Sequence, residues 1–190
     1  MITQYSYGNN TNPNLSNNVI DRLKEWSAAE IRADLDKNRS KMVCVFENIG
    51  YNINIACAIR SMNAFLGREC YIVGRRRYDS RGACGTNHYE HVFHADTLQE
   101  VYDKLSGDGY RFVAVDNIME CSPKNIWDAE FQEKTAFVFG SESAGLSQDA
   151  IELCDEMVYI KQDGSVRSMN VACAASCVMA EYTRRFRRSA

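Results

Sequence analysis

The sequence predicts an α/β domain with a mainly parallel sheet and helices on both faces. The chain has 190 residues and 45% hydrophobic content, which fits one ordinary domain. Apolar runs of four to six residues alternate with longer segments of helical period, and we find no internal repeat. A chain of this length buries about 70% of the surface of its unfolded form, so a hydrophobic core forms without disulfides or metal.

Five short apolar segments rich in β-branched and aromatic residues are the predicted strands, and segments of helical period separate them. We expect strands at 42–46, 70–73, 112–115, 135–139 and 157–160, and helices at 53–65, 98–105, 147–153 and 169–186. A further helix is expected at 19–36, with apolar residues on or near one face. We therefore divide the chain into an N-terminal arm and helix extension (1–40) and an α/β domain with a basic C-terminal helix (41–190).

The sequence contains no clear signal for membrane insertion, export or metal binding. No stretch approaches 18 apolar residues and the first 18 residues are polar, so we expect a soluble, cytoplasmic protein without a membrane span. The eight cysteines include no C-x-x-C pair, so reduced thiols are expected and a zinc site is disfavoured. His88, His91 and His94 lie near Cys84, which leaves a metal cluster as an alternative. We favour a strand with partly exposed histidines and no metal.

Charge is segregated along the chain although the net charge is only −3. Residues 96–165 carry fifteen acidic and five basic side chains, whereas residues 166–190 carry one and five. Arginines gather in two regions, at Arg75, Arg76, Arg77 and Arg81 and at Arg184, Arg185, Arg187 and Arg188. Guanidinium groups suit phosphate recognition and base stacking, so RNA is the first partner to test; solvated surface arginines are the alternative.

The segment 140–147 follows a predicted buried strand, where α/β sheets place their chemistry. Its glycines are spaced as in a phosphate-binding loop, but Leu146 stands where the lysine is required, which disfavours an NTPase. Gly140 and Ser143 are one residue too far apart for a G-x-S-x-G nucleophile elbow. No G-x-G-x-x-G occurs, so dinucleotide oxidoreductases and ordinary Rossmann-type methyltransferases lack their fingerprint.

Two further segments carry polar residues at expected strand exits. In the first, Arg60 projects from a largely apolar helix, where an unpaired charge would be costly; a surface arginine is the alternative. In the second, Ser168 is an expected N-cap, and the helix that follows is rich in small residues. Small residues allow close approach of another backbone, a second subunit included, although they also serve ordinary packing.

These three segments together resemble the SpoU/TrmH-type branch of the SPOUT superfamily, RNA ribose 2′-O-methyltransferases that use S-adenosylmethionine. The similarity covers roughly residues 41–186. It is carried by Asn54 to Arg60 (like N-x-x-A-I-x-R), Phe139 to Leu146 (like G-x-E-x-x-G-[LI]) and Ile160 to Asn170 (like I-P-M-x-G-x-x-x-S-L-N). The loop 81–88 is similar to the small-residue loop of the family that faces RNA. Lys161 and Gln162 replace the Pro-Met of the family, and Met169 replaces its Leu.

The resemblance implies a C-terminal trefoil knot, a homodimer with the active site near the subunit interface, and no metal. It also implies roles for individual residues, which we list by role. The reaction centre is expected at Arg60, Glu142, Ser168 and Asn170; cofactor contacts at Phe139, Gly140, Ile160, Ser168 and Met169; and RNA contacts at Asn54, Arg60, Arg81, Arg184, Arg185, Arg187 and Arg188.

The expected activity is methyl transfer from S-adenosylmethionine to a ribose 2′-hydroxyl of RNA. Arg60 is expected to hold the target phosphate and to stabilise the developing alkoxide. Only about forty residues precede the core, too few for the separate RNA-binding domain of many ribosomal-RNA members of the family. The short N-terminal helix and the basic C-terminal helix resemble the transfer-RNA members more, so the resemblance implies transfer RNA as the substrate. A ribosomal-RNA methyltransferase and a non-catalytic RNA-binding protein of the same fold are the alternatives.

Overall fold

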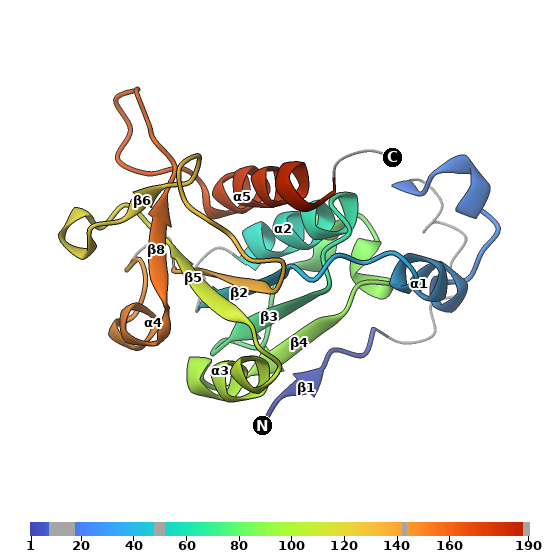
Figure 1. Cartoon of the computed structure of the whole chain (residues 1–190). Coiled ribbons are helices and arrows are strands. Elements are labelled where there is room, and N and C mark those ends of the chain that lie inside the picture. Colours follow the sequence, from blue (N-terminus) through green and yellow to red (C-terminus); the bar gives the residue numbers. More distant parts are fainter. Residues whose placement is uncertain (8–17, 48–51, 142–143, 188–190) are drawn as a thin grey trace.

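The computed structural model describes residues 1–7, 18–47, 52–141 and 144–187, which form an eight-stranded sheet with helices on both faces (Figure 1). The strand order is β1-β4-β3-β2-β7-β5-β8-β6, and every pairing except β1 with β4 is parallel. The α/β class with a mainly parallel sheet is therefore confirmed. The knot stays a prediction.

Each of the five expected strands forms within one residue of its predicted ends. They are β2 (Val43–Glu47), β3 (Glu69–Val73), β5 (Arg111–Val115), β7 (Thr135–Phe139) and β8 (Glu156–Tyr159). A strand near the histidines also forms, β4 (Val92–Ala95). The two-residue strands β1 (Thr3–Gln4) and β6 (Lys124–Asn125) were not expected, because segments this short carry no periodic signal.

Two helices cover each face of the sheet, because alternate residues along a strand point to opposite sides. Helices α2 (Asn52–Ala64) and α5 (Val171–Phe186) pack with Cys44 and Phe46 of β2 in one apolar cluster. Helices α3 (Leu98–Gly107) and α4 (Gln148–Leu153) pack with Val43 and Val45 in another. Figure 1 shows the two pairs on opposite sides of the strands.

The prediction of a single helix at 19–36 is wrong. A short 3-10 turn at Asp21–Leu23 is followed by α1 (Ala28–Asp36). Ser27 starts α1 as its N-cap: its side chain accepts a hydrogen bond from the Glu30 backbone N–H, while the Glu30 side chain accepts one from the Ser27 backbone. This capping box fixes Ser27 in an extended conformation, which a continuous helix cannot contain.

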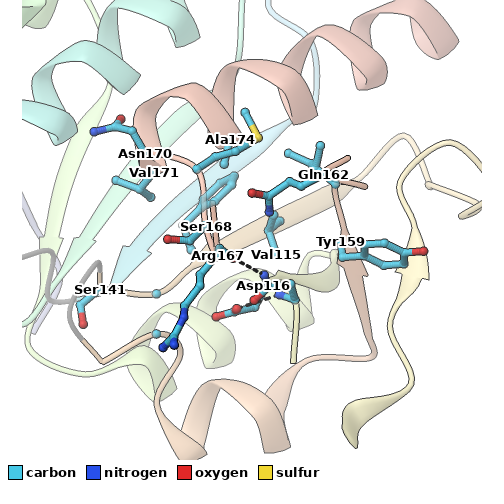
Figure 2. Close-up of a pocket in the computed structure, with 16 residues that line it drawn as sticks. Val115, Asp116, Ser141, Tyr159, Gln162, Arg167, Ser168, Asn170, Val171 and Ala174 are labelled. Atoms are coloured by element: carbon cyan, nitrogen blue, oxygen red, sulfur yellow. Dashed lines mark hydrogen bonds between the residues drawn. The ribbon is translucent and has the colours of Figure 1, made fainter. Parts of the chain in front are cut away.

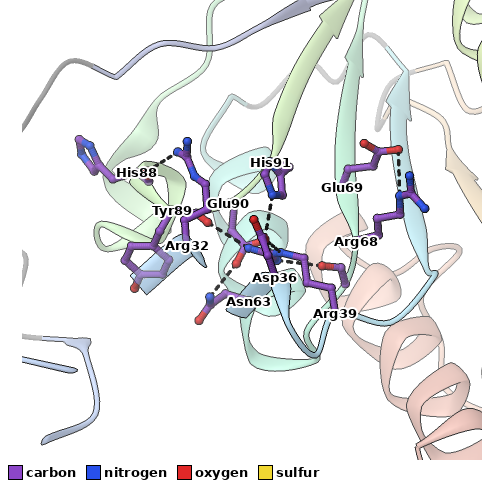
Figure 3. Close-up of polar contacts among 11 residues, drawn as sticks. Arg32, Asp36, Arg39, Asn63, Arg68, Glu69, His88, Tyr89, Glu90 and His91 are labelled. Atoms are coloured by element: carbon purple, nitrogen blue, oxygen red, sulfur yellow. Dashed lines mark hydrogen bonds and ion pairs between the residues drawn. The ribbon is translucent and has the colours of Figure 1, made fainter. Parts of the chain in front are cut away.

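A buried ion pair attaches the segment after α1 to the loop that precedes β4 (Figure 3). The Arg39 guanidinium donates to Glu90 at 2.6 Å, and the two side chains are only 6% and 2% exposed. Arg39 also donates to the Gly67 carbonyl, and Asn63 donates to the other Glu90 oxygen at 2.6 Å. Burial raises the pKa of Glu90, and the positive charge of Arg39 acts in the opposite direction and lowers it. Residues 18–40 are therefore fastened to the α/β domain by buried polar contacts.

We expect Arg39→Met to lower the free energy of unfolding by about 3–5 kcal/mol, because it leaves the Glu90 carboxylate buried without a cation. Urea unfolding measures this loss. Lys37→Met is the matched control, because the Lys37 side chain is exposed and the ion pairs of exposed lysines contribute little to stability. In the Arg39 variant the pKa of Glu90 rises further above its unfolded value, so the loss of stability should grow as the pH rises above the ordinary pKa of a glutamate. Equal losses in both variants would contradict this role.

Within the described residues, the structure contains no helix with the length and apolar character needed to cross a bilayer.

Candidate active site

The candidate site lies at the carboxyl ends of three neighbouring strands, where α/β sheets bind ligands. β5 lies between β7 and β8, so Val115, Phe139 and Tyr159 end side by side. The loops that follow these strands and the first turn of α5 enclose a pocket of ≈ 550 Å³. Cavities of about 300–1,000 Å³ hold small organic ligands, so this pocket is large enough for a cofactor.

The pocket has an apolar wall and a polar rim (Figure 2). The wall includes Val115, Phe139, Ile160, Met169, Val171 and Ala174. The rim includes Asp116, Asn117, Ser141, Arg167 and Ser168, and the side chain of Gln162 lines the pocket beside the apolar wall. Asn117 ties two rim segments together, because its side-chain amide donates to the Arg167 carbonyl at 2.8 Å. A ligand with an apolar ring and polar substituents matches these surroundings.

Gly140 begins the loop after β7 and lies against the backbone of the same loop. Ser141 and Gly145 exchange two backbone hydrogen bonds, of 2.9 and 2.8 Å. A Cβ atom at Gly140 would lie 2.2 Å from the carbonyl carbon of Gly145, so no other residue fits without moving backbone. Gly145 has a φ of +70°, which glycine adopts without strain. The two glycines thus set the shape of this side of the pocket.

The loop is also fastened to the neighbouring strand β2. Glu47, at the end of β2, accepts a hydrogen bond from the Ser147 backbone N–H at 2.9 Å and a second from the Ser147 hydroxyl. Ser147 in turn is the N-cap of α4, because its side chain accepts a hydrogen bond from the Ala150 backbone. The loop between β7 and α4 is therefore held at its α4 end.

We expect Gly140→Ala to lower the midpoint of urea unfolding, because the added methyl group forces the loop backbone apart. Gly164→Ala is the matched control, since a Cβ there would meet no atom within 4 Å and the residue does not have a positive φ. Circular dichroism measures both transitions. An unchanged midpoint for Gly140→Ala would show that the loop relaxes freely.

The segment before α5 differs from the expectation in its capping residue. Asn170, not Ser168, is the N-cap: its side-chain oxygen accepts a hydrogen bond from the Ala172 backbone N–H at 2.9 Å. The helix therefore begins at Val171, two residues later than expected. Asn170 also donates to the Asn54 side chain at 3.1 Å and so joins the starts of α2 and α5. Ser168, released from capping, is exposed on the pocket rim.

Six of the predicted cofactor and reaction-centre residues line one pocket: Phe139, Gly140, Ile160, Ser168, Met169 and Asn170. Glu142 lies outside the described residues. Sequence reasoning missed Asp116, Asn117 and Arg167. Asp116 and Asn117 directly follow the predicted strand 112–115, so their position at a strand exit could have identified them.

Arg60 is absent from the residues that line this pocket. It is exposed, and its guanidinium donates to the Cys84 sulfur at 3.4 Å and to the Asn18 side chain at 3.3 Å. Six helical residues separate it from Asn54, which places it about 9 Å along the axis of α2 and on another face. The Arg60 charge therefore carries no burial cost, and within one chain Arg60 does not line the pocket.

The other predicted arginine contacts differ in their exposure. Arg81 pairs with Asp79, and the hydrogen bonds from Arg81 lower the pKa of Asp79 to about 2. The Arg184 side chain is 61% exposed and pairs with Glu181. Arg185 is only 18% exposed and donates to Glu181 and to the Ile126 carbonyl, so the structure gives it an internal role. Arg187 is half-buried at the helix end, and Arg188 lies outside the described residues.

The described residues contain no group of three or more His, Cys, Asp or Glu side chains able to hold a metal ion. His91 contacts Asp36, and His94 contacts the Gly74 carbonyl.

Comparisons with known proteins agree on one family. The model of the SpoU rRNA methylase family matches residues 41–180. The tRNA (guanosine(18)-2′-O)-methyltransferase of Escherichia coli K12 is 25% identical over 162 residues, which cover 82% of this chain and 69% of that protein. The SpoU methyltransferase AviRb of Streptomyces viridochromogenes, solved with AdoMet, is 26% identical with a TM-score of 0.70 over 80% of this chain and 60% of that one. The A. aeolicus TrmH/SpoU tRNA modifying enzyme shares the fold, with a TM-score of 0.72 and 19% identity. The match covers 83% of this chain and 81% of that one.

Proposed function

The chain belongs to the SpoU rRNA methylase family, whose model matches residues 41–180, and from this premise we propose that it methylates a ribose 2′-hydroxyl of tRNA with S-adenosylmethionine. The observation that carries the proposal is the pocket at the ends of β5, β7 and β8. The curated E. coli relative, a tRNA 2′-O-methyltransferase, matches 82% of this chain and favours tRNA over ribosomal RNA.

The residues of the pocket fit this cofactor. S-adenosylmethionine combines a flat adenine ring with hydroxyl, ammonium and carboxylate groups. The apolar wall suits the ring, and the rim offers Asp116 for cationic or hydroxyl groups and Arg167 for a carboxylate. Phe139, Gly140, Ile160 and Met169 would hold the cofactor as the sequence predicts. When bound, it supplies an electrophilic methyl group to the attacking hydroxyl.

The chain must orient the ribose hydroxyl and stabilise the negative charge that develops on it. Ser168 is exposed on the rim, so its hydroxyl can accept or donate a hydrogen bond to the ribose. Asn170 positions this segment through its contacts with Ala172 and Asn54. Arg60 supplies a permanent positive charge for the phosphate and the developing alkoxide.

The position of Arg60 supports the proposed homodimer. Arg60 does not line the pocket of its own chain, which fits an assembly in which each copy supplies its Arg60 to the pocket of the other. Ala172 and Ala175 of α5 are buried in the core cluster shared with α2, which accounts for part of the small-residue pattern by ordinary packing. Cys173 and Ala180 remain exposed on the same helix, where a second subunit can approach. Exposed Arg81 and Arg184 and half-buried Arg187 are the proposed RNA contacts, with Asn54 near the pocket.

The proposal is tested by incubating the protein with radiolabelled S-adenosylmethionine and unmodified tRNA, then digesting the RNA and identifying 2′-O-methyl nucleosides by mass spectrometry. We expect label in tRNA and none in ribosomal RNA. Label in ribosomal RNA alone would favour the alternative substrate. Cofactor binding by calorimetry without transfer to either RNA would favour a non-catalytic RNA-binding protein.

A further inference from the structure

Gln162 carries a buried polar atom that no described residue satisfies. It follows β8 and lines the pocket, and Figure 2 shows its side chain directed into the pocket toward Val115. Its carboxamide oxygen is buried and accepts no hydrogen bond within the described part of the chain. Burying an acceptor without a hydrogen-bond partner destabilises the fold, so folded proteins rarely keep such an atom without use. The atom is therefore suited to a partner that enters with the ligand.

The surroundings of Gln162 select the part of the ligand that it meets. Apolar Val115, Ile160 and Ala174 line the pocket together with this carboxamide. The charged Asp116 and Arg167 are on the polar rim, where they suit the ribose and amino-acid groups. Adenine is the flat apolar part of the cofactor, and its exocyclic amine is the hydrogen-bond donor on that ring. A carboxamide offers an acceptor and a donor side by side and can pair with the amine and ring nitrogen of adenine in two bonds.

We propose that Gln162 is a specificity-determining residue that recognises the exocyclic amine of the cofactor adenine. This inference rests on the proposed function, because it requires an adenosyl ligand in the pocket. The family motif that this segment resembles has a methionine at this position, and a thioether is only a weak acceptor. The replacement of that methionine by Gln162 thus adds a recognition contact to this chain.

The test measures calorimetric affinities of the full chain for two ligands, S-adenosylhomocysteine and its analogue with purine in place of adenine, which lacks the exocyclic amine. The variants are Gln162→Met and Gln162→Leu, and Gln99→Met is the control because Gln99 is exposed on α3 and bonds to Asp103. Thermal unfolding checks that each variant is folded. The two Gln162 variants differ in size, so agreement between them separates lost hydrogen bonding from altered packing.

We expect wild type and Gln99→Met to bind S-adenosylhomocysteine about tenfold more tightly than the purine analogue, and both Gln162 variants to lose this preference. The same preference in the Gln162 variants, whether or not both affinities fall together, would show that the carboxamide does not recognise the amine and would overturn the inference. Absence of binding of either ligand to wild type is a different result, because it removes the proposed function itself.

Discussion

Arg60→Ala is expected to lower the single-turnover rate of methyl transfer to RNA by about 10²–10³-fold and to leave the affinity for S-adenosylhomocysteine unchanged. The rate should fall without a change in affinity because of where Arg60 lies. It is exposed on α2 and outside the pocket lining, so its removal alters no cofactor contact of its own chain. A guanidinium that contacts the developing alkoxide acts most strongly in the transition state, so the loss appears in rate.

Quenched-flow measurement of the label transferred at saturating RNA gives this rate, and calorimetry gives the affinity. Arg22→Ala is the matched control, because Arg22 is also an exposed arginine and pairs with Asp34 away from the pocket. Arg60→Lys keeps the charge but loses the planar fork of donors, so only partial rescue is expected. A normal rate in Arg60→Ala would remove Arg60 from the reaction centre.

The sheet was predictable because its strands are buried on both faces and read as short apolar runs. The helix at 19–36 was mispredicted because apolar spacing continues across Ser27, while the capping box with Glu30 restarts the helix there. The serine at 168 and the asparagine at 170 both suit an N-cap, and the sequence alone does not decide between them. In the structure Asn170 is the N-cap, and its side chain also contacts Asn54, which is more than a hundred residues away in the chain.

The site was predictable where its residues follow strands in motifs, as at Phe139, Gly140, Ile160 and Met169. It was not predictable where three-dimensional contacts decide the role. Arg185 stands among four arginines, yet its guanidinium lies over the Phe131 ring at 4.5 Å and donates to the Ile126 carbonyl. Gln162 was noticed as a departure from the motif, but its buried acceptor becomes visible only in the folded pocket. The roles of Arg185 and Gln162 therefore depend on their burial against residues that are distant in the sequence.

The second large effect is expected in mixed dimers, because the pocket and the Arg60 that serves it belong to different protomers in the proposed assembly. Ala174→Trp fills the pocket, since Ala174 lines it from α5, and should abolish cofactor binding. Arg60→Ala retains a normal pocket. Each variant alone is then inactive, but in a mixed dimer the open pocket of the Arg60→Ala protomer meets the intact Arg60 of the other protomer.

After subunit exchange of equal amounts, about half of the dimers are mixed and each has one complete site, so activity should recover to roughly a quarter of wild type. This recovery is far above the residual rate of either variant, and it is measured with the same label-transfer assay. Light scattering must show that both variants remain dimers, and a mixture of Ala174→Trp with an Arg60→Ala/Ala174→Trp double variant is the inactive control. No recovery from exchanged dimers would place Arg60 and the pocket in the same protomer, and a mass of about 21.6 kDa for wild type would exclude the shared site altogether.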